Sequence, residues 1–434
     1  ALPIFHVTKN EGKQWELVSK NIPSLAPWGT ISNICASAFD AGTAYVSIHF
    51  QMEGDFAPYI YKTTDYGKTW QSVTGNLPRN NSGFVHFIKE DPGQKGLLFA
   101  GTDNGLYVSG NDGKEWIQLK RNLPPAPVYH IEIQPNFRDV IVATYGRGIY
   151  ILDDITAIRE WSKSGKNNSI QLYPFRTAYR FNQQNRNHDG GDGVKGGQNP
   201  EDQAVAQYFL PDTLSKAPQL ILLNATGDTI NCFTGTNLKG INRVWFSLAH
   251  KSIEAPILKT IPRGKSFVKL DEKGNRRPYI NDLDMAPGME GLRLPPGKYQ
   301  FILEANGTRQ QQPITLLKDP ESKATPEQIN EQYNWGKNLF AAIERAHRLI
   351  EKMEVERAAL LKTKSPASLQ REDAIYQLEA KLIDVHQAGA RWDSFRNPSQ
   401  LLEHLLGLSK EALSMGADYP PTTQQKKVLE QLQQ

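Results

Sequence analysis

The stretch TTDYGKTW, residues 63–70, decides the fold because its layout occurs three times in the chain. TKNEGKQW occupies residues 8–15, and SGNDGKEW occupies residues 109–116. Each copy has Ser or Thr first, Asp or Asn two positions on, Gly four on and Trp seven on, and Asn-(Ile/Leu)-Pro begins six residues after each Trp. The copies begin 55 and 46 residues apart, and repeats of about 40–50 residues are typical of β-propeller blades.

We name each copy a box, and the residue types suggest how a box folds. The Asp65 side chain is expected to accept a hydrogen bond from a backbone N–H two residues on, and Gly67 to supply a positive φ. Trp70 is expected to be buried between neighbouring sheets. Each box has too few carboxylates for the alternative, a calcium loop, so the predicted role is structural. The shared positions are Thr8, Asn10, Gly12 and Trp15, then Thr63, Asp65, Gly67 and Trp70, then Ser109, Asn111, Gly113 and Trp116.

The segments around the boxes read as short antiparallel strands, about four to each repeat. Residues 96–119 predict a strand, a turn, a strand, a box and a last strand, and residues 139–154 repeat the first half of that order. HFIKEDP at 86–92 and HIEIQPN at 130–136 are matching short strands that precede them. This alignment places His86 and His130 at equivalent positions.

The boxes resemble the Asp-box, or bacterial neuraminidase repeat, and FDAGTAYVSIHF with PYIYKTTDYGKTW resembles large bacterial sortilin-type β-propeller proteins. ATYGRGIYILDDI is similar to the last blade of those proteins, and GGQNPEDQAVAQYFL, GINRVWFSL and LPPGKYQFIL are similar to the β-sandwich that follows it. The resemblance implies an extracytoplasmic location. Such proteins often carry the label glycosyl hydrolase, which a fold alone does not justify.

Three boxes precede residue 155, whereas a closed propeller typically needs 4–8 blades. We therefore expect residues 1–155 to be the C-terminal blades of an incomplete ring. The expected partner is an N-terminal propeller portion, from the same polypeptide before cleavage or from another chain.

The rest of the chain predicts a connector at 156–204, a small β-sandwich at 205–317 and an antiparallel α-helical bundle at 318–434. The overall fold class is therefore multidomain and mainly β. The connector ends in a loop that resembles the start of a calcium site but has Gly at its twelfth position; its residues are Asn185, Asn187, Asp189, Gly190 and Gly196.

The helical region shows apolar residues at helical spacing. A capping box at Thr325 starts a helix with Ile329, Tyr333, Phe340, Ile343, Ile350 and Met353, and Ser365 starts a second with Leu369, Leu378, Leu382 and Val385. Two further helices are predicted near the C-terminus. His347, His386 and His404 lie in this region and do not form a metal-ligand pair.

Composition excludes several classes of function. A net charge of +4 offers no electrostatic case for nucleic acid, and no apolar run is long enough for a membrane helix. Cys35 and Cys232, the two cysteines, form neither a disulfide framework nor a metal site. No cofactor motif is present: YGRGIY lacks one glycine of the dinucleotide fingerprint.

In a propeller the loops opposite the boxes share one rim, where a ligand is expected. That rim would present His49, Glu53 and Asp55 from one blade, His86, Asp103 and Asn104 from the next, and His130, Tyr145 and Arg147 from the last. The predicted ligand-binding residues are Arg147, Tyr145, His130, His86, His49 and Asp103, with no catalytic residue assigned.

The predicted function is non-catalytic binding of a protein, peptide or glycan partner. A propeller glycoside hydrolase is the first alternative, because two of the rim acids could act together. A structural subunit of a cell-surface assembly is the second. A sialidase is not expected, because Arg147 stands essentially alone on this rim.

Overall fold

The computed structural model describes residues 3–120, 122–164, 169–181, 204–271, 291–386, 397–409, 413 and 418–434. The chain is mainly β and packs as two compact units. The first unit comprises Ala1–Arg176, Gln207–Leu214 and Leu238–Arg243, and the second comprises Thr177–Ala206, Ser215–Asn237 and Val244–Gln434. No helix in these described ranges is long and apolar enough to cross a membrane.

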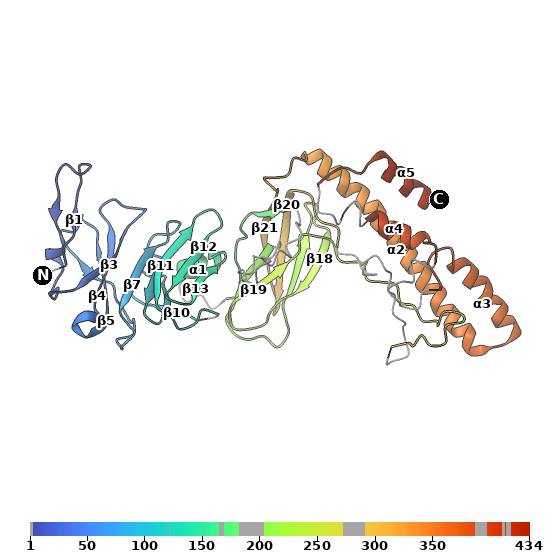
Figure 1. The fold of residues 1–434 in the computed structure, drawn as a ribbon, viewed down its shortest axis with the longest axis horizontal. Coiled ribbons are helices and arrows are strands. Elements are labelled where there is room, and N and C mark those ends of the chain that lie inside the picture. The colour runs from blue at the N-terminus through green and yellow to red at the C-terminus, as the bar shows by residue number, and fades with distance from the viewer. Residues whose placement is uncertain are drawn as a thin grey trace. The chain divides into compact units, whose positions relative to one another are not determined.

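The first unit begins with a two-stranded sheet and continues with three antiparallel sheets in chain order. We name these sheets the first meander (β3–β6), the second meander (β7–β10) and the third meander (β11–β13), and Figure 1 shows β4, β7 and β11 as neighbours. The elements are β1 (His6–Val7), β2 (Glu16–Leu17), η1 (Ser19–Asn21), β3 (Thr30–Ala36), β4 (Ala44–Phe50), η2 (Gln51–Glu53), β5 (Asp55–Thr63), β6 (Gln71–Ser72), β7 (Val85–Glu90), β8 (Leu98–Thr102), β9 (Gly105–Ser109), β10 (Ile117–Leu119), β11 (Val128–Gln134), β12 (Asp139–Thr144) and β13 (Gly148–Leu152).

All three boxes fold into the same hydrogen-bonded turn. The Thr63 hydroxyl accepts a bond from the Gly67 N–H at 2.9 Å and donates to Asp65 Oδ1 at 2.8 Å. Because Thr63 takes that N–H, Asp65 instead accepts from the N–H of Thr69, four residues on, at 2.9 Å, so the predicted spacing of two is wrong. Tyr66 and Gly67 both have positive φ, as a type I′ turn requires. The same bonds run from Gly12 to Thr8 and Gln14 to Asn10, and from Gly113 to Ser109 and Glu115 to Asn111.

The tryptophans of the second and third boxes are buried between sheets, as predicted. Trp70 is 7% exposed and meets Phe5 edge to face, with ring centroids 5.5 Å apart. Trp116 is 4% exposed, and its indole N–H donates to the Val73 carbonyl at 3.2 Å. Trp15 is 61% exposed, so the predicted burial is wrong for the first box. The physical reason is that no earlier sheet covers it within the described residues.

The Asn of each of the first two Asn-(Ile/Leu)-Pro triplets bonds to the box of the next repeat. The Asn21 side chain donates to the Gly67 carbonyl at 2.8 Å. Asn76 accepts from the Trp116 N–H at 2.6 Å and donates to the Trp116 carbonyl at 3.2 Å. The triplets therefore hold neighbouring repeats in a fixed register.

Among the described residues the third meander has three strands and ends at β13. It leads into α1 (Thr156–Ser164), a helix that the sequence analysis did not predict within its connector. Arg159 on α1 donates two hydrogen bonds to the buried Asp91 carboxylate, at 2.7 and 2.6 Å. This bidentate pair of hydrogen bonds holds α1 against the loop that follows β7.

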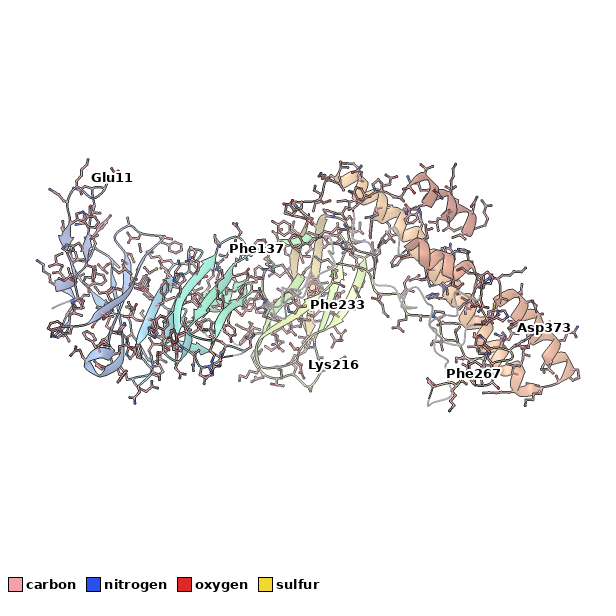
Figure 2. The ribbon with its side chains drawn as sticks, viewed as in Figure 1. Glu11, Phe137, Lys216, Phe233, Phe267 and Asp373 are labelled. Carbon is pink, nitrogen blue, oxygen red and sulfur yellow. The ribbon has the colours of Figure 1, made fainter. Side chains whose placement is uncertain are left out.

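Two further sheets follow α1. One has the order β14-β16-β19, and the other has the order β15-β21-β20-β17-β18, in which β15 runs parallel to β21. Phe246 packs on Phe301 at 4.3 Å and on Phe233 at 5.5 Å, and Phe233 is labelled in Figure 2. The predicted domain boundaries and the sandwich stay predictions, and the calcium-like loop at 185–196 lies outside the described residues. The strands are β14 (Gln171–Leu172), β15 (Ala178–Arg180), β16 (Ala204–Leu210), β17 (Gln219–Leu223), β18 (Thr229–Thr234), β19 (Gly240–Phe246), β20 (Gly297–Ala305) and β21 (Thr308–Lys318).

Helices α2 (Pro326–Thr363), α3 (Pro366–Glu379), α4 (Leu401–Ser409) and α5 (Thr423–Leu432) share one apolar core. The Thr325 capping box is confirmed: Thr325 Oγ1 accepts from the Gln328 N–H at 3.3 Å, and Gln328 Oε1 accepts from the Thr325 N–H at 2.9 Å. The bundle arrangement itself stays a prediction.

The predicted apolar face of α3 is wrong. Leu369 and Leu378 are exposed, and Leu382 and Val385 follow the helix rather than belonging to it. The buried face carries Glu372, Tyr376 and Glu379 instead. Polar residues lie there because Arg357 of α2 pairs with both glutamates, at 2.9 and 2.7 Å.

Candidate functional site

The predicted rim residues lie at the strand ends opposite the boxes. The boxes connect β1 to β2, β5 to β6 and β9 to β10. The other ends carry the β4–β5 connection after His49, the β8–β9 turn with Asp103 and Asn104, and the β12–β13 turn with Tyr145 and Arg147. The antiparallel order of each meander thus separates the two sets of turns.

A bulge at one position of each first strand determines which side chains meet. The pairing register shifts around Ser32 in β3, His86 in β7 and Tyr129 in β11. A bulge adds one residue and re-aims its side chain. Tyr129 is therefore the counterpart of His86, and the predicted equivalence of His86 with His130 is wrong by one residue.

Two of the bulged residues, His86 and Tyr129, lie in a continuous set of ring contacts. The His86 ring stacks on Tyr129 with centroids 4.1 Å apart and meets Phe84 at 4.9 Å. Tyr129 meets Tyr145 at 5.6 Å, and His49 lies 6.2 Å from His86. We name this set the ring site; its residues are His49, Phe56, Phe84, His86, Asp103, Tyr129 and Tyr145.

A hydrogen bond orients His86 within the ring site. His86 Nε2 lies 3.1 Å from Asp103 Oδ1, and because a carboxylate oxygen accepts, Nε2–H is the donor. Burial lowers the pKa of His86, although Asp103 opposes that shift. Burial and then the nearby His86 lower the pKa of His49. Burial therefore favours the uncharged form of both rings.

One fully buried polar atom of the ring site has no hydrogen-bond partner among the described residues. That atom is Nδ1 of the buried His49. A buried polar nitrogen without a partner costs stability, and a buried water molecule is the usual way to satisfy such an atom.

Other predicted rim residues lie outside the ring site. The His130 ring packs on Phe87 at 4.5 Å, because Phe87 is its counterpart across the bulge. Asp55 accepts from the Tyr59 hydroxyl at 2.6 Å, and Glu53 lies exposed in η2. Arg147 is exposed at the tip of the β12–β13 turn, between Gly146 and Gly148.

Sequence reasoning missed three members of the ring site: Phe56, Phe84 and Tyr129. A usable signal exists for Tyr129. Aligning VHFIKE with VYHIEI on their first valine, rather than on histidine, places Tyr129 opposite His86. Equivalent hydrogen bonds support that alignment, since Asp103 N–H donates to the Phe84 carbonyl and Tyr145 N–H to the Pro127 carbonyl.

The ring site has the means to stack a ligand and to bond it, and we assign it no metal. Within the described ranges no group of three or more His, Cys, Asp or Glu could hold one. Asp103 is the one acid of the ring site, and it is already bonded to His86. The arrangement therefore supplies aromatic faces with a few polar atoms, as in many binding sites.

Comparisons with known proteins do not assign a family. No protein-family model and no curated protein matches the chain. A GH74 enzyme of Niastella koreensis is similar at a TM-score of 0.24 and 14% identity, covering 65% of this chain and 38% of that one. An ancestral GH74 enzyme is similar at 0.29 and 12% identity, covering 71% and 37%.

The extracellular domain of a protein named as a hybrid two component system from B. thetaiotaomicron is similar at a TM-score of 0.20 and 12% identity. That match covers 63% of this chain and 29% of the other. This chain thus spans less than two-fifths of the length of each of these three structures. Similarity at these scores carries no argument about activity.

Proposed function

We propose that this protein binds a partner at the ring site without chemical turnover, and that its three meanders are blades of a β-propeller. The observation that carries the binding proposal is the ring site itself: solvent-exposed tyrosines continue into buried rings that include an unpartnered His49 nitrogen. A protein, a peptide or a glycan fits this description. From the family resemblance we propose an extracytoplasmic location.

The packing of the meanders supports the propeller arrangement. Their first strands are neighbours, since β7 lies against both β3 and β11. Lys89 on β7 pairs with Glu132 on β11 at 2.8 Å, at equivalent positions of the two strands. A common register between successive sheets is what blades arranged around an axis require.

Two exposed apolar positions support a further part of the proposal, that another β meander packs against the third meander. Leu106 and Val108 on β9 are 3% and 2% exposed, because the third meander covers them. Their register equivalents on β13, Ile149 and Ile151, are 70% and 60% exposed. We propose that a meander from an N-terminal propeller portion, in the same polypeptide or another chain, covers this face.

The hydrolase alternative is weaker on the geometry. A glycosidase normally needs two carboxyl groups facing one bond, at separations of about 5–9.5 Å. In the ring site the Asp103 carboxylate is already hydrogen-bonded to His86, and outside it the Asp55 carboxylate accepts a hydrogen bond from Tyr59. We therefore assign no catalytic residue.

Binding and turnover can be tested together on the 434-residue chain. Soluble oligosaccharides and extended peptides would be titrated by calorimetry, and each bound probe recovered and weighed by mass spectrometry. We expect a bound probe to be recovered intact and its affinity to fall in Tyr145→Ala. Cleavage products that disappear in Asp103→Asn would instead establish the hydrolase.

A further inference from the structure

The exposed part of the ring site is a platform made by two tyrosines. Tyr129 is 50% exposed and Tyr145 is 72% exposed. Their ring centroids are 5.6 Å apart with an interplanar angle of 37°. Rings at this separation and tilt are in direct contact, with part of one ring overlapping the other, so they leave no slot between them.

Direct contact between the rings favours some ligands over others. A proline-rich peptide docks into aromatic-lined grooves, which two touching rings do not form by themselves. A nucleic acid would also stack on tyrosine, but its phosphates need a basic surface, and the chain carries a net charge of only +4. A ligand with a broad flat face and no charge fits better.

Pyranose sugars have that shape and chemistry. When the substituents of the sugar ring are equatorial, its axial C–H bonds form a flat face with a small positive charge. The π face of tyrosine carries negative charge, so the two faces attract each other. Two touching rings address neighbouring parts of the same ligand, which favours a linear chain of sugars over a single sugar.

Polar groups stand next to the platform, as sugar hydroxyls require. Asp103 Oδ1 is held by His86, whose ring stacks on Tyr129, and the second carboxylate oxygen is available to accept from a hydroxyl. Arg147 lies two residues after Tyr145 in the same turn and is exposed, with its guanidinium N–H groups as donors. An acceptor and a donor therefore lie close to the stacking surface.

We propose that Tyr129 and Tyr145 bind consecutive pyranose units of a linear, equatorially linked glycan, and that Asp103 and Arg147 bond its hydroxyl groups. This inference rests on the proposed function and names the ligand class of the same site. The glycan lies across the rings, with hydroxyl groups pointing sideways toward the two polar residues.

The test uses calorimetry on the full chain with five named probes: cellopentaose, xylopentaose, mannopentaose, maltopentaose and a proline decapeptide. We expect at least one of the three β-1,4-linked pentasaccharides to bind more tightly than α-linked maltopentaose. Tyr129→Ala and Tyr145→Ala should each weaken that binding about tenfold, which corresponds to about 1.4 kcal/mol. Tyr145→Phe should retain most of the affinity, because it keeps the ring.

Tyr419→Ala is the matched control, since Tyr419 is similarly exposed and belongs to the second unit. It should leave binding unchanged, and melting curves should show that all four variants fold. Binding of the proline decapeptide alone, lost in Tyr145→Ala, would overturn the glycan and leave the proposed function standing. Binding that is absent, or equal in Tyr145→Ala and wild type, would overturn both.

Discussion

Strands β9 and β13 occupy the same place in successive meanders but have opposite surroundings. β9 reads GLYVS and β13 reads GIYIL, and each follows a turn that begins with a threonine whose hydroxyl donates to the carbonyl of the glycine opening the strand. Leu106 and Val108 of β9 are buried against the third meander, whereas Ile149 and Ile151 of β13 are exposed. A pattern of apolar residues therefore fixes the strand and its register, while burial depends on the neighbour.

The three box tryptophans, at the other edge of the sheets, also show that burial depends on the neighbouring repeat. Trp70 and Trp116 are buried by residues of the preceding repeat, and Trp15 is exposed. Gly67 and Gly113 show the closeness of that packing, because a Cβ at either would lie within 3 Å of Val18 or Val73. The first box makes the same turn with no such contact at Gly12, so the turn does not depend on the packing.

Replacing the box tryptophans should give the largest difference in stability between equivalent positions. Trp70→Ala leaves a cavity between sheets and should lower the free energy of unfolding by about 3–5 kcal/mol. Trp15→Ala removes an exposed ring and should change it by less than about 0.5 kcal/mol. Urea unfolding of both variants measures the difference, and equal losses would contradict the packing described here.

Truncation on the two equivalent strands should give the next largest contrast. Leu106→Ala should cost about 2–5 kcal/mol, because the third meander cannot fully close around the missing atoms. Ile149→Ala should stay within about 0.5 kcal/mol in the 434-residue chain. If a further meander covers β13 in a complete assembly, the Ile149→Ala cost should rise there toward that of Leu106→Ala.

A buried carboxyl group should make the second unit lose stability as pH rises. Burial, and then the charge of Glu354, raise the pKa of Glu379 to about 8, although Arg357 opposes them. An unfolded glutamate has a pKa of about 4.3, so between about pH 5 and 8 the folded chain holds a proton that the unfolded chain has released. The free energy of unfolding should therefore fall as pH rises through that window.

Glu379→Gln should flatten this pH dependence, because the amide does not titrate. Urea unfolding followed by helical circular dichroism, at about pH 5 and pH 8, measures the slope. Glu356→Gln is the control, since Glu356 pairs with Arg371 at the surface and should leave the slope unchanged. An unaltered slope in Glu379→Gln would show that another group is responsible.

The carboxylate of Asp65 should have the smallest effect on stability. Its contribution should be lost as pH falls, whereas that of Glu379 is lost as pH rises. Hydrogen bonds from the hydroxyl and N–H of Thr69 lower the pKa of Asp65 to about 2. Its stabilising contribution is therefore present above the unfolded pKa of about 3.9 and is lost as pH falls toward 2. Asp65→Ala should lower the melting temperature slightly at neutral pH and reduce the acid-induced loss. Added calcium should not shift the melting temperature, and a shift abolished by Asp65→Ala would restore the metal-loop interpretation.

The fold of the first unit was readable because its signals are local. The spacing of hydroxyl residue, acid or amide, glycine and tryptophan specifies a turn through bonds within eight residues, as the Thr63–Gly67 and Asp65–Thr69 bonds show. The sequence did not predict which face of α3 is buried. Glu372 and Glu379 are polar, and only the buried Arg357 on another helix makes their burial tolerable.

The candidate site was readable only in part. His49, His86, Asp103 and Tyr145 were expected on one rim, and the structure brings them into the ring site. Tyr129 was missed and His130 misplaced, because strict alternation along a strand assumes no bulge. One extra residue at a bulge exchanges the faces of the side chains beyond it, and the pairing with β12 that reveals it is not local.

The sequence by itself determined the box turns, the strand order of the meanders and the starts of the long helices. Each depends on residues close together in the chain, whose hydrogen bonds and φ preferences act without distant partners. The tertiary structure alone decided which tryptophan is buried, which apolar strand face stays exposed and which rings meet. Those outcomes depend on contacts with segments far apart in the sequence, because an apolar side chain is removed from water only where another segment covers it.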